Sequence, residues 1–294
     1  MILVAANPYS GAGRNRRRVD LLVGALRALG ADTRVLWQPE ETAAVLGQAT
    51  DGGCRAVVAA GGDGTVAAVV NALPPGVPLA VLPLGNENLL AGALGLSREP
   101  AALARAIVAC RTRVIDLGRA SAAGRSRLFT LMLGAGFDAA VVHRVAAWRT
   151  TAGGLRRVRR ASYIARIAAC CVSYPYAPLE LATDTAAARG VQCVIANVPG
   201  YALGVRLTPT ATPDDGRLDW LVLERSGLAS LLAYCWTAYR GRHLERADVR
   251  AGQATRLRVT AATPTPVQLD GDAWGTTPVD VEVVPRALTL IETR

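Results

Sequence analysis

Lysine is absent from this 294-residue chain, and its formal net charge of +10 comes from arginine. A composition with one kind of cation partly reflects how a genome encodes basic residues, so it says little about partners. Positive charge suits nucleic acid, an anionic membrane or an anionic substrate. Aromatic residues make up only 5% of the chain, which is poor for stacking on bases, and no helix-turn-helix, zinc-finger or RNA-binding signature is present. We therefore expect no nucleic-acid partner.

Three further absences narrow the class of protein. The six cysteines form no C-x-x-C pair, so they predict neither a disulfide framework nor a metal site. No run of about 18 apolar residues is free of charge, and even the stretch 218–239 contains Asp219, Glu224 and Arg225, so we expect no membrane-spanning helix. The chain opens directly into a strand pattern without a basic segment or a small-residue cleavage site. We therefore expect no secretory signal and a cytoplasmic protein.

The first part of the chain alternates short apolar strands with helical patterns. This alternation predicts a mostly parallel sheet with helices on both faces, and ligands of such sheets bind at the carboxyl ends of the strands. We expect an α/β domain over residues 1–119. Its expected strands are 2–6, 33–37, 55–60, 78–82 and 112–117, and its expected helices are 14–29, 40–49, 65–73, 88–95 and 98–109.

The pattern changes near residue 118. The segment 120–127 is small and polar, which is typical of a linker, and strand-like runs separated by turn-rich pieces follow it. We expect a mainly β second domain over residues 120–294, interrupted by helical insertions at about 139–174 and 226–239. Its last strand is a candidate to return to the first domain. The expected strands are 127–133, 177–182, 191–198, 218–223, 255–260, 266–269, 279–284 and 287–291.

A glycine-rich loop follows the strand at 55–60. Gly61, Gly62 and Gly64 let a ligand approach the backbone, and the helix behind them favours anions at its N-terminus. Asp63 lies in the middle of the loop and would repel a phosphate unless a cation lies between them or the carboxylate handles a proton. Together with Thr65, the loop indicates a nucleoside triphosphate, a divalent metal and phosphoryl transfer. The alternative is a plain strand-to-helix turn.

Two other turns follow strands of the expected parallel sheet. The turn after the first strand and the turn after the fourth are rich in asparagine, serine and glycine, which can hydrogen-bond a nucleotide or cap a helix, and the sequence leaves both possibilities open. Because the carboxyl ends of parallel strands lie at one edge, we expect both turns to converge on the glycine loop. The candidate nucleotide-binding residues in these turns are Asn7, Ser10, Gly11, Gly85, Asn86 and Asn88.

A family resemblance emerges from the order of the motifs. The chain has N-P-x-S-G from Asn7, G-G-D-G-T-x-x-x-V-x-N from Gly61 and L-P-L-G-x-x-N-x-x-A-x-x-L-G from Leu82. Its second half has G-x-G-F-D-A from Gly134, D-D-G-x-L-D from 214 and Q-x-D-G-D from 268. In this order, over nearly the whole chain, they resemble the diacylglycerol kinase catalytic-domain family, which includes sphingosine and ceramide kinases and bacterial relatives.

The resemblance implies a doubly wound α/β nucleotide-binding domain like those of phosphofructokinase and NAD kinase, followed by a β-sandwich. It implies an active site in the cleft between them, ATP with Mg²⁺, and phosphoryl transfer to the hydroxyl of diacylglycerol or a related lipid in phospholipid biosynthesis. By this match Asp63 lies near the metal or phosphate and Asp270 is the candidate base, although which of the two acts as base stays open. Asp272 would help to hold the metal.

The resemblance also implies further metal ligands and one departure. Asp116 matches another acidic position of the metal network, and Asp214 and Asp215 match a second, structural metal site, for which a type I turn is the alternative. The third motif of the family is usually G-T-x-N-D-F-A-R. Here Asn86, Leu89 and Gly92 replace its threonine, aspartate and arginine. The lost carboxylate puts metal stoichiometry and catalytic strength in question, unless Glu87 offsets it.

A basic stretch at 144–166 lies in a segment without acidic residues. It combines arginines at helical spacing with apolar and aromatic residues, which suits an anionic membrane surface, although a solvated face over a core is the alternative. We therefore expect a lipid kinase that associates peripherally with the inner face of the membrane. Two rival functions stay open: a soluble kinase acting on NAD or a sugar, and a lipid-binding protein of the same fold with weakened catalysis.

Overall fold

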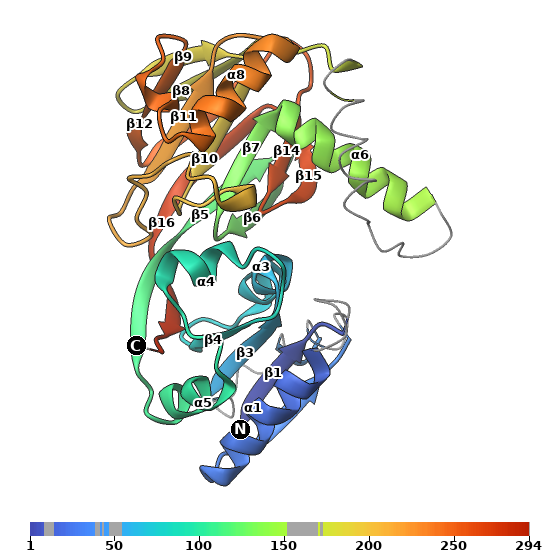
Figure 1. The fold of residues 1–294 in the computed structure, drawn as a ribbon, viewed down its shortest axis with the longest axis vertical. Coiled ribbons are helices and arrows are strands. Elements are labelled where there is room, and N and C mark those ends of the chain that lie inside the picture. Colours follow the sequence, from blue (N-terminus) through green and yellow to red (C-terminus); the bar gives the residue numbers. More distant parts are fainter. Residues whose placement is uncertain are drawn as a thin grey trace. The chain divides into compact units, whose positions relative to one another are not determined.

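The computed structural model describes residues 1–8, 15–38, 42, 44–46, 55–151, 170 and 173–293. The chain divides into two compact units, one of residues 1–117 and 285–294 and the other of residues 118–284 (Figure 1). The chain therefore passes between the units twice, once within the long strand β5 (Thr112–Ala122) and once within β16 (Val279–Ile291).

The first unit is built on a parallel sheet. Its strands run in the order β2, β1, β3, β4 and then the end of β16, which pairs with β4 through Leu290 and Leu79. The last strand of the chain thus returns to this unit. The elements are β1 (Ile2–Ala6), α1 (Asn15–Ala28), β2 (Thr33–Leu36), β3 (Ala56–Gly61), α3 (Asp63–Ala72), β4 (Leu79–Pro83), α4 (Leu89–Leu94) and α5 (Pro100–Val108).

The core of this unit follows from its apolar strands. Every residue of β1, β3 and β4 is buried, as expected for parallel strands that are covered on both faces. Leu22 and Leu26 of α1 pack with Leu103 and Ile107 of α5 against this sheet. The predicted strands and helices of this half are confirmed to within one or two residues, except that the strand predicted at 112–117 continues to residue 122 as β5. The predicted helix 40–49 lies only partly in the described residues, which are helical at 42 and 44–46.

The second unit contains two antiparallel sheets. One has β16, β13, β8 and β9 in order, with the hairpin β5–β6 beside β16, and the other has β12, β11, β10, β7, β14 and β15. Its remaining elements are β6 (Arg125–Phe129), β7 (Met132–Gly136), α6 (Phe137–Thr151), β8 (Leu179–Thr183), β9 (Ala187–Gly190), β10 (Gln192–Ala196), η1 (Ala202–Gly204), β11 (Leu218–Leu223), α8 (Leu228–Tyr239), η2 (His243–Glu245), β12 (Val249–Ala254), β13 (Arg256–Ala261), β14 (Pro266–Leu269) and β15 (Asp272–Thr276).

Side chains of both sheets form one core in this unit. Leu181 and Val259 come from the first sheet, and Ile195, Trp220 and Leu269 come from the second. Two sheets that share a core in this way form a β-sandwich. The predicted fold class, an α/β domain with a β-sandwich, is therefore confirmed. The predicted helical insertion at 226–239 is α8, and α6 forms the described start of the insertion at 139–174.

The linker predicted at 120–127 is wrong. Residues 120–122 pair with 125–127 in the β5–β6 hairpin. Ala123 and Gly124 both have positive φ, which is the conformation that a two-residue hairpin turn requires. Small polar residues therefore mark a turn here. The strand predicted at 127–133 is two strands, and those predicted at 279–284 and 287–291 are one.

Among the helices of the described residues, none is long and apolar enough to cross a membrane.

We predict that Gly118→Ala destabilises the second unit. A Cβ at Gly118 would lie 2.0 Å from the ring of Phe129, which is fully buried. Such overpacking costs about 1–3 kcal/mol of unfolding free energy, measurable by urea denaturation. Gly275→Ala is the matched control, because no described atom lies within 4 Å of its Cβ. Equal stability of the two variants would contradict the prediction.

Candidate active site

The glycine loop of the first unit is shaped by contacts with its neighbours. A Cβ at Gly61 would lie 2.2 Å from Oγ1 of Thr65, and a Cβ at Gly85 would lie 2.6 Å from Cα of Gly62. The turns after β3 and β4 therefore touch backbone to backbone, which only glycine allows. Gly64 differs, since no described atom lies within 4 Å of the position of its Cβ.

Asp63 joins the glycine loop to the next turn. Its carboxylate accepts hydrogen bonds from the backbone N–H groups of Leu89, at 3.0 Å, and Leu90, at 3.3 Å. These are the first two residues of α4, whose N-cap residue Asn88 makes no side-chain cap of its own. A carboxylate in this position stabilises a helix N-terminus through its free amides. Asp63, predicted to lie near metal or phosphate, thus caps α4 from a distant part of the sequence.

Asn88 and Asn7 hold the three turns together. Asn88 is buried, has a positive φ, and its side chain bonds both the N–H and the C=O of Gly85. The amide nitrogen of Asn7 lies 3.4 Å from Oγ1 of Thr65. The convergence of the turns at the carboxyl ends of β1, β3 and β4 is confirmed. Asn86 is exposed, and the candidates Ser10 and Gly11 lie outside the described residues.

Asp116 lies near the end of the part of β5 that belongs to the first unit. It is buried, and its carboxylate accepts a hydrogen bond of 2.7 Å from the backbone N–H of Arg286. Arg286 has a positive φ and lies in β16. Asp116, predicted as a metal ligand, therefore helps to hold the returning end of the chain.

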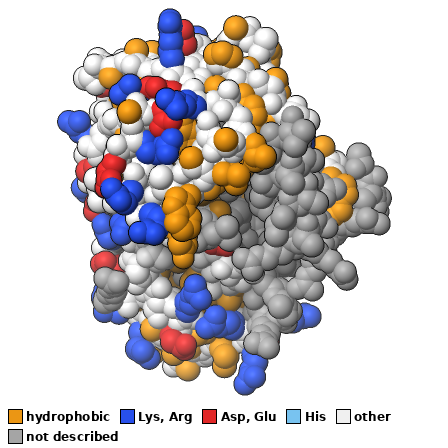
Figure 2. Space-filling view, turned by 45° about the horizontal axis from the view of Figure 1, so that its top comes forward, with side chains coloured by type: hydrophobic (Ala, Val, Ile, Leu, Met, Phe, Trp, Pro, Cys, Tyr) orange, Lys and Arg blue, Asp and Glu red, His pale blue; other side chains and the backbone are white. Residues whose placement is uncertain are grey.

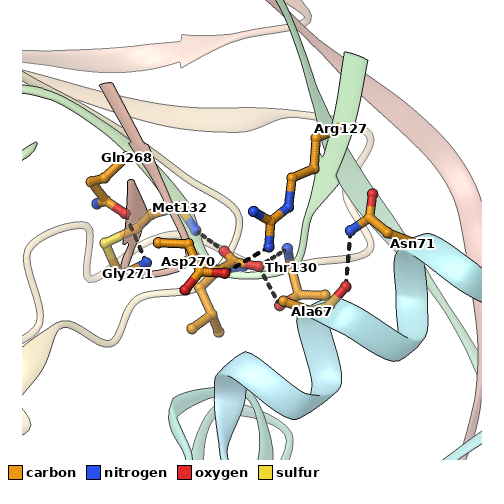
Figure 3. A network of polar contacts seen from close by, with 10 residues as sticks. Ala67, Asn71, Arg127, Thr130, Met132, Gln268, Asp270 and Gly271 are labelled. Atoms are coloured by element: carbon orange, nitrogen blue, oxygen red, sulfur yellow. Dashed lines mark hydrogen bonds and ion pairs between the residues drawn. The ribbon is translucent and has the colours of Figure 1, made fainter. Parts of the chain in front are cut away.

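Asp270 occupies the turn between β14 and β15 in the second unit. Asp270 and Gly271 both have positive φ and form a two-residue hairpin loop, a conformation for which Asp-Gly is a preferred pair. The buried carboxylate accepts four hydrogen bonds, from the backbone N–H groups of Thr130, Leu131 and Met132 and from the Thr130 hydroxyl, all within 3.0 Å (Figure 3). Burial raises the pKa of Asp270, and these donors oppose the rise.

The remaining predicted acidic residues are more exposed. Asp272 forms an ion pair of 2.8 Å with Arg127, so its charge is compensated. Asp214 and Asp215 are exposed, and Asp215 accepts a hydrogen bond from the backbone N–H of Arg217, as the turn alternative expects. Over the described ranges, no group of three or more His, Cys, Asp or Glu side chains is arranged to hold a metal ion.

Asp138 was not selected from the sequence, although the G-x-G-F-D-A motif contains it. Its half-buried carboxylate accepts a hydrogen bond of 2.5 Å from the Tyr201 hydroxyl and one of 3.1 Å from the Gln268 amide. Burial raises the pKa of Asp138, and both donors oppose the rise. Gln268 also accepts a hydrogen bond from the N–H of Gly271 (Figure 3). This network therefore connects Asp138 to the hairpin turn that carries Asp270.

We predict that Asp270→Asn lowers the stability of the protein, although the side chains of aspartate and asparagine have nearly the same shape. An amide nitrogen would meet one pair of N–H or O–H donors and leave them without an acceptor, which costs about 1–3 kcal/mol. Urea denaturation measures the loss. Asp280→Asn is the control, because Asp280 pairs with Arg258 at an exposed site where such pairs contribute at most about 1 kcal/mol. If both variants lose the same free energy, the four-donor arrangement is unimportant for stability.

The pH dependence of stability tests the Asp138 network. Since its folded pKa is raised, Asp138 contributes stability that is complete below its unfolded pKa of about 3.9 and is lost as pH rises through the folded value. Tyr201→Phe removes a donor that lowers this pKa, so its penalty in unfolding free energy should grow between pH ~4 and ~8 by about 1 kcal/mol. Tyr239→Phe, at an exposed tyrosine, should show no such trend. A pH-independent penalty would contradict the prediction.

Comparison with known proteins agrees with this architecture. Residues 1–120 match the diacylglycerol kinase catalytic domain, and residues 132–292 match the YegS C-terminal NAD kinase beta sandwich-like domain. A diacylglycerol kinase of Mycobacterium tuberculosis is 28% identical over 100% of this chain and 95% of its own length. A Pseudomonas aeruginosa protein named "Probable lipid kinase YegS-like" is 30% identical over 95% of this chain and 90% of its own.

A solved structure shows the same fold at lower identity. A crystal structure of a diacylglycerol kinase from Bacillus anthracis str. Sterne superposes with a TM-score of 0.70 at 18% identity and covers 99% of this chain and 96% of the other. On the strength of the two domain matches and the full-length relatives, the chain belongs to the family of diacylglycerol kinase-like and YegS-like lipid kinases.

Proposed function

We propose that this protein is an ATP-dependent kinase that transfers the γ-phosphate to the hydroxyl of diacylglycerol or a related lipid. The proposal rests on one observation in a chain of this family: the turns that follow β1, β3 and β4 lie together around residues 61–65. Turns at the carboxyl ends of parallel strands are where such sheets bind nucleotides.

The loop offers a place for phosphate oxygens. The open position beside Gly64 leaves room for a ligand against the backbone. Helix α3 begins at Asp63, and none of the described side chains caps its N-terminus, so its first amides remain available to an anion. Gly61, Gly62 and Thr65 are the accompanying candidates, with Asn7 placing the Thr65 hydroxyl.

Mg²⁺ fits the chemistry of the candidate residues, because carboxylates are hard oxygen ligands. In phosphoryl transfer Mg²⁺ usually binds one or two carboxylates and otherwise phosphate and water oxygens, so it needs no cluster of protein ligands. Asp63 retains unused lone pairs beyond its two amide contacts and is the proposed contact, with Asp116 and Asp272 as the further candidates. When bound, the ion would neutralise charge that develops on the phosphates. Asp214 and Asp215 remain candidates for a second, structural ion.

The proposed reaction is a single displacement at phosphorus. The oxygen of the lipid hydroxyl forms a bond to the γ-phosphorus, the bond to the bridging oxygen of ADP breaks, and the hydroxyl proton passes to a carboxylate. Asp270 is the proposed acceptor. All four of its lone-pair sites already receive donors, so accepting a proton requires one donor to leave. The Thr130 hydroxyl is the only one of the four that can rotate away, so Oδ2 is the proposed proton-accepting atom.

The proposal extends to the membrane, where a diacylglycerol substrate resides. We take the protein to be cytoplasmic and to associate peripherally with an anionic inner membrane surface through the stretch 144–166. Most of that stretch, with Arg156, Arg159 and Arg160, lies outside the described residues. The support is therefore its arginine-rich, acid-free sequence.

The test is an assay with γ-labelled ATP and a panel of acceptors. Label should appear in a chloroform-extractable product when diacylglycerol or a related lipid is present, and chelation of divalent metal should abolish it. Label in a water-soluble product from NAD or a sugar would favour the first rival. Lipid binding without label on any acceptor would favour a binding protein of the same fold.

Two glycine-to-alanine variants test whether the proposed kinase activity depends on the glycine loop. Gly62→Ala would place a Cβ 3.2 Å from Cα of Gly85, so the two turns must separate. We predict that it lowers kcat/KM for ATP by about tenfold or more, since small displacements of phosphate-positioning groups have effects of this size. Gly24→Ala in α1 is the matched control, with no described atom within 4 Å of its Cβ. Unchanged kinetics of Gly62→Ala would contradict the proposed role of the loop.

A further inference from the structure

Helix α8 (Leu228–Tyr239) carries an apolar face that the protein leaves uncovered. Its 12 residues include no charged side chain. Leu228, Leu232, Trp236 and Tyr239 are 48%, 60%, 61% and 74% exposed. Spacings of four, four and three residues put these four side chains on one side of the helix, which we call the α8 outer face. Large exposed apolar surfaces of this kind mark interaction sites.

The opposite side of α8 is fixed to the second unit. Tyr234 and Ala238 are buried, and Tyr234 packs with Leu221 and Val249. The Tyr234 hydroxyl accepts a hydrogen bond from the N–H of Arg225 and donates one to the carbonyl of Asp248. The outer face is therefore presented by an anchored helix and is not a consequence of poor packing.

Arginines surround the α8 outer face. Arg240 stacks over the ring of Trp236 at 5.6 Å and forms no ion pair with any described residue. Arg225 and Arg242 are paired with Asp248 and Glu245, but their side chains remain 72% and 67% exposed. Between residues 224 and 250 there are five arginines (225, 240, 242, 246 and 250) and three acids (224, 245 and 248), a surplus of two positive charges. Figure 2 shows hydrophobic side chains beside arginine side chains on the face that it views.

A hollow beside the outer face is lined by three of these arginines and by Glu245. It has a volume of about 310 Å³, and Trp236 forms one of its walls. Guanidinium groups bind phosphate through paired hydrogen bonds, so such a hollow suits the phosphate of a lipid headgroup. Its lining residues are Trp236, Thr237, Arg240, Arg242, Glu245 and Arg246.

We propose that the α8 outer face docks on the surface of an anionic lipid bilayer, with the helix lying in the plane of the interface. Leucine and tryptophan side chains would enter the boundary between headgroups and acyl chains, and the arginines would contact lipid phosphates. At about 1.5 Å per residue, α8 is about 18 Å long and too short to span a bilayer. The purpose of this docking, to bring the enzyme to its substrate, rests on the proposed lipid kinase function.

The charge around the face favours a bilayer over a second copy of the chain. A symmetric dimer through α8 would bring two arginine-rich surroundings together, each with a positive surplus, and like charges across an interface are unfavourable. An anionic bilayer offers both the apolar layer and the opposite charge. It also matches the pairing of tryptophan and tyrosine with arginine at membrane interfaces.

Vesicle co-sedimentation without nucleotide tests the docking directly. Wild-type protein should bind vesicles of phosphatidylcholine mixed with phosphatidylglycerol more tightly than vesicles of phosphatidylcholine alone. Leu232→Glu should weaken this binding by about tenfold or more. Leu21→Glu is the matched control, because Leu21 on α1 is similarly exposed at 55%. Arg240→Glu should reduce the preference for the anionic vesicles.

Two outcomes would overturn the docking. The first is binding by Leu232→Glu equal to wild type, including a case in which only charge reversal of Arg156, Arg159 and Arg160 releases the protein. The second is a Leu232-dependent dimer in sedimentation without vesicle binding, which would assign the face to a second copy.

Phosphorylation of a short-chain, monomeric diacylglycerol separates this proposal from the proposed function. Leu232→Glu should retain the wild-type rate on that acceptor. Vesicle binding without phosphorylation of any lipid would leave the docking intact and remove the kinase proposal.

Discussion

The contact between Gly62 and Gly85 is the constraint on which the arrangement of the strand-end turns in the first unit depends. The two turns after neighbouring parallel strands touch at these glycines: a Cβ on Gly85 would lie 2.6 Å from Cα of Gly62, and a Cβ on Gly62 would lie 3.2 Å from Cα of Gly85. Their contact brings Asp63 to the start of α4, where it supplies the acceptor that the helix lacks. The sheet, the loop and helix α4 are thus held together by one close approach, and the position beside Gly64, which no described neighbour fills, is where we propose that the ligand binds.

The candidate site carboxylates also hold parts of the fold in place, so replacing one of them can change the structure as well as the chemistry. Asp63 caps a helix, Asp116 holds the backbone of β16, and Asp270 gathers four donors from the 130–132 turn. A buried carboxylate is tolerated only with such partners. If such a variant loses activity, the cause can be the missing carboxylate itself or a displacement of the backbone that the carboxylate holds. Stability must be measured beside turnover to tell these apart.

The sequence predicts the strands well where they are uniformly apolar, as in β1, β3 and β4, and it predicts that their ends converge. It fails at 120–127, because small polar residues are common to linkers and to hairpin turns and only the partner strand decides between them. The bond from Asp63 to the amides of Leu89 and Leu90 was also beyond prediction, since it joins residues distant in sequence. Asp138 lay within a visible motif, but its burial and its partners Tyr201 and Gln268 arise only from the fold.

The substitution of leucine at position 89 can be separated into two effects. Asp63 contacts position 89 through the backbone N–H, which every residue except proline provides, so leucine leaves the helix cap intact. What leucine removes is a side-chain carboxylate at the first turn of α4. The architecture of the loop therefore does not depend on that carboxylate, and any consequence falls on cation binding. Because Mg²⁺ can complete its coordination with phosphate and water oxygens, Asp63 can retain its proposed role without that neighbour.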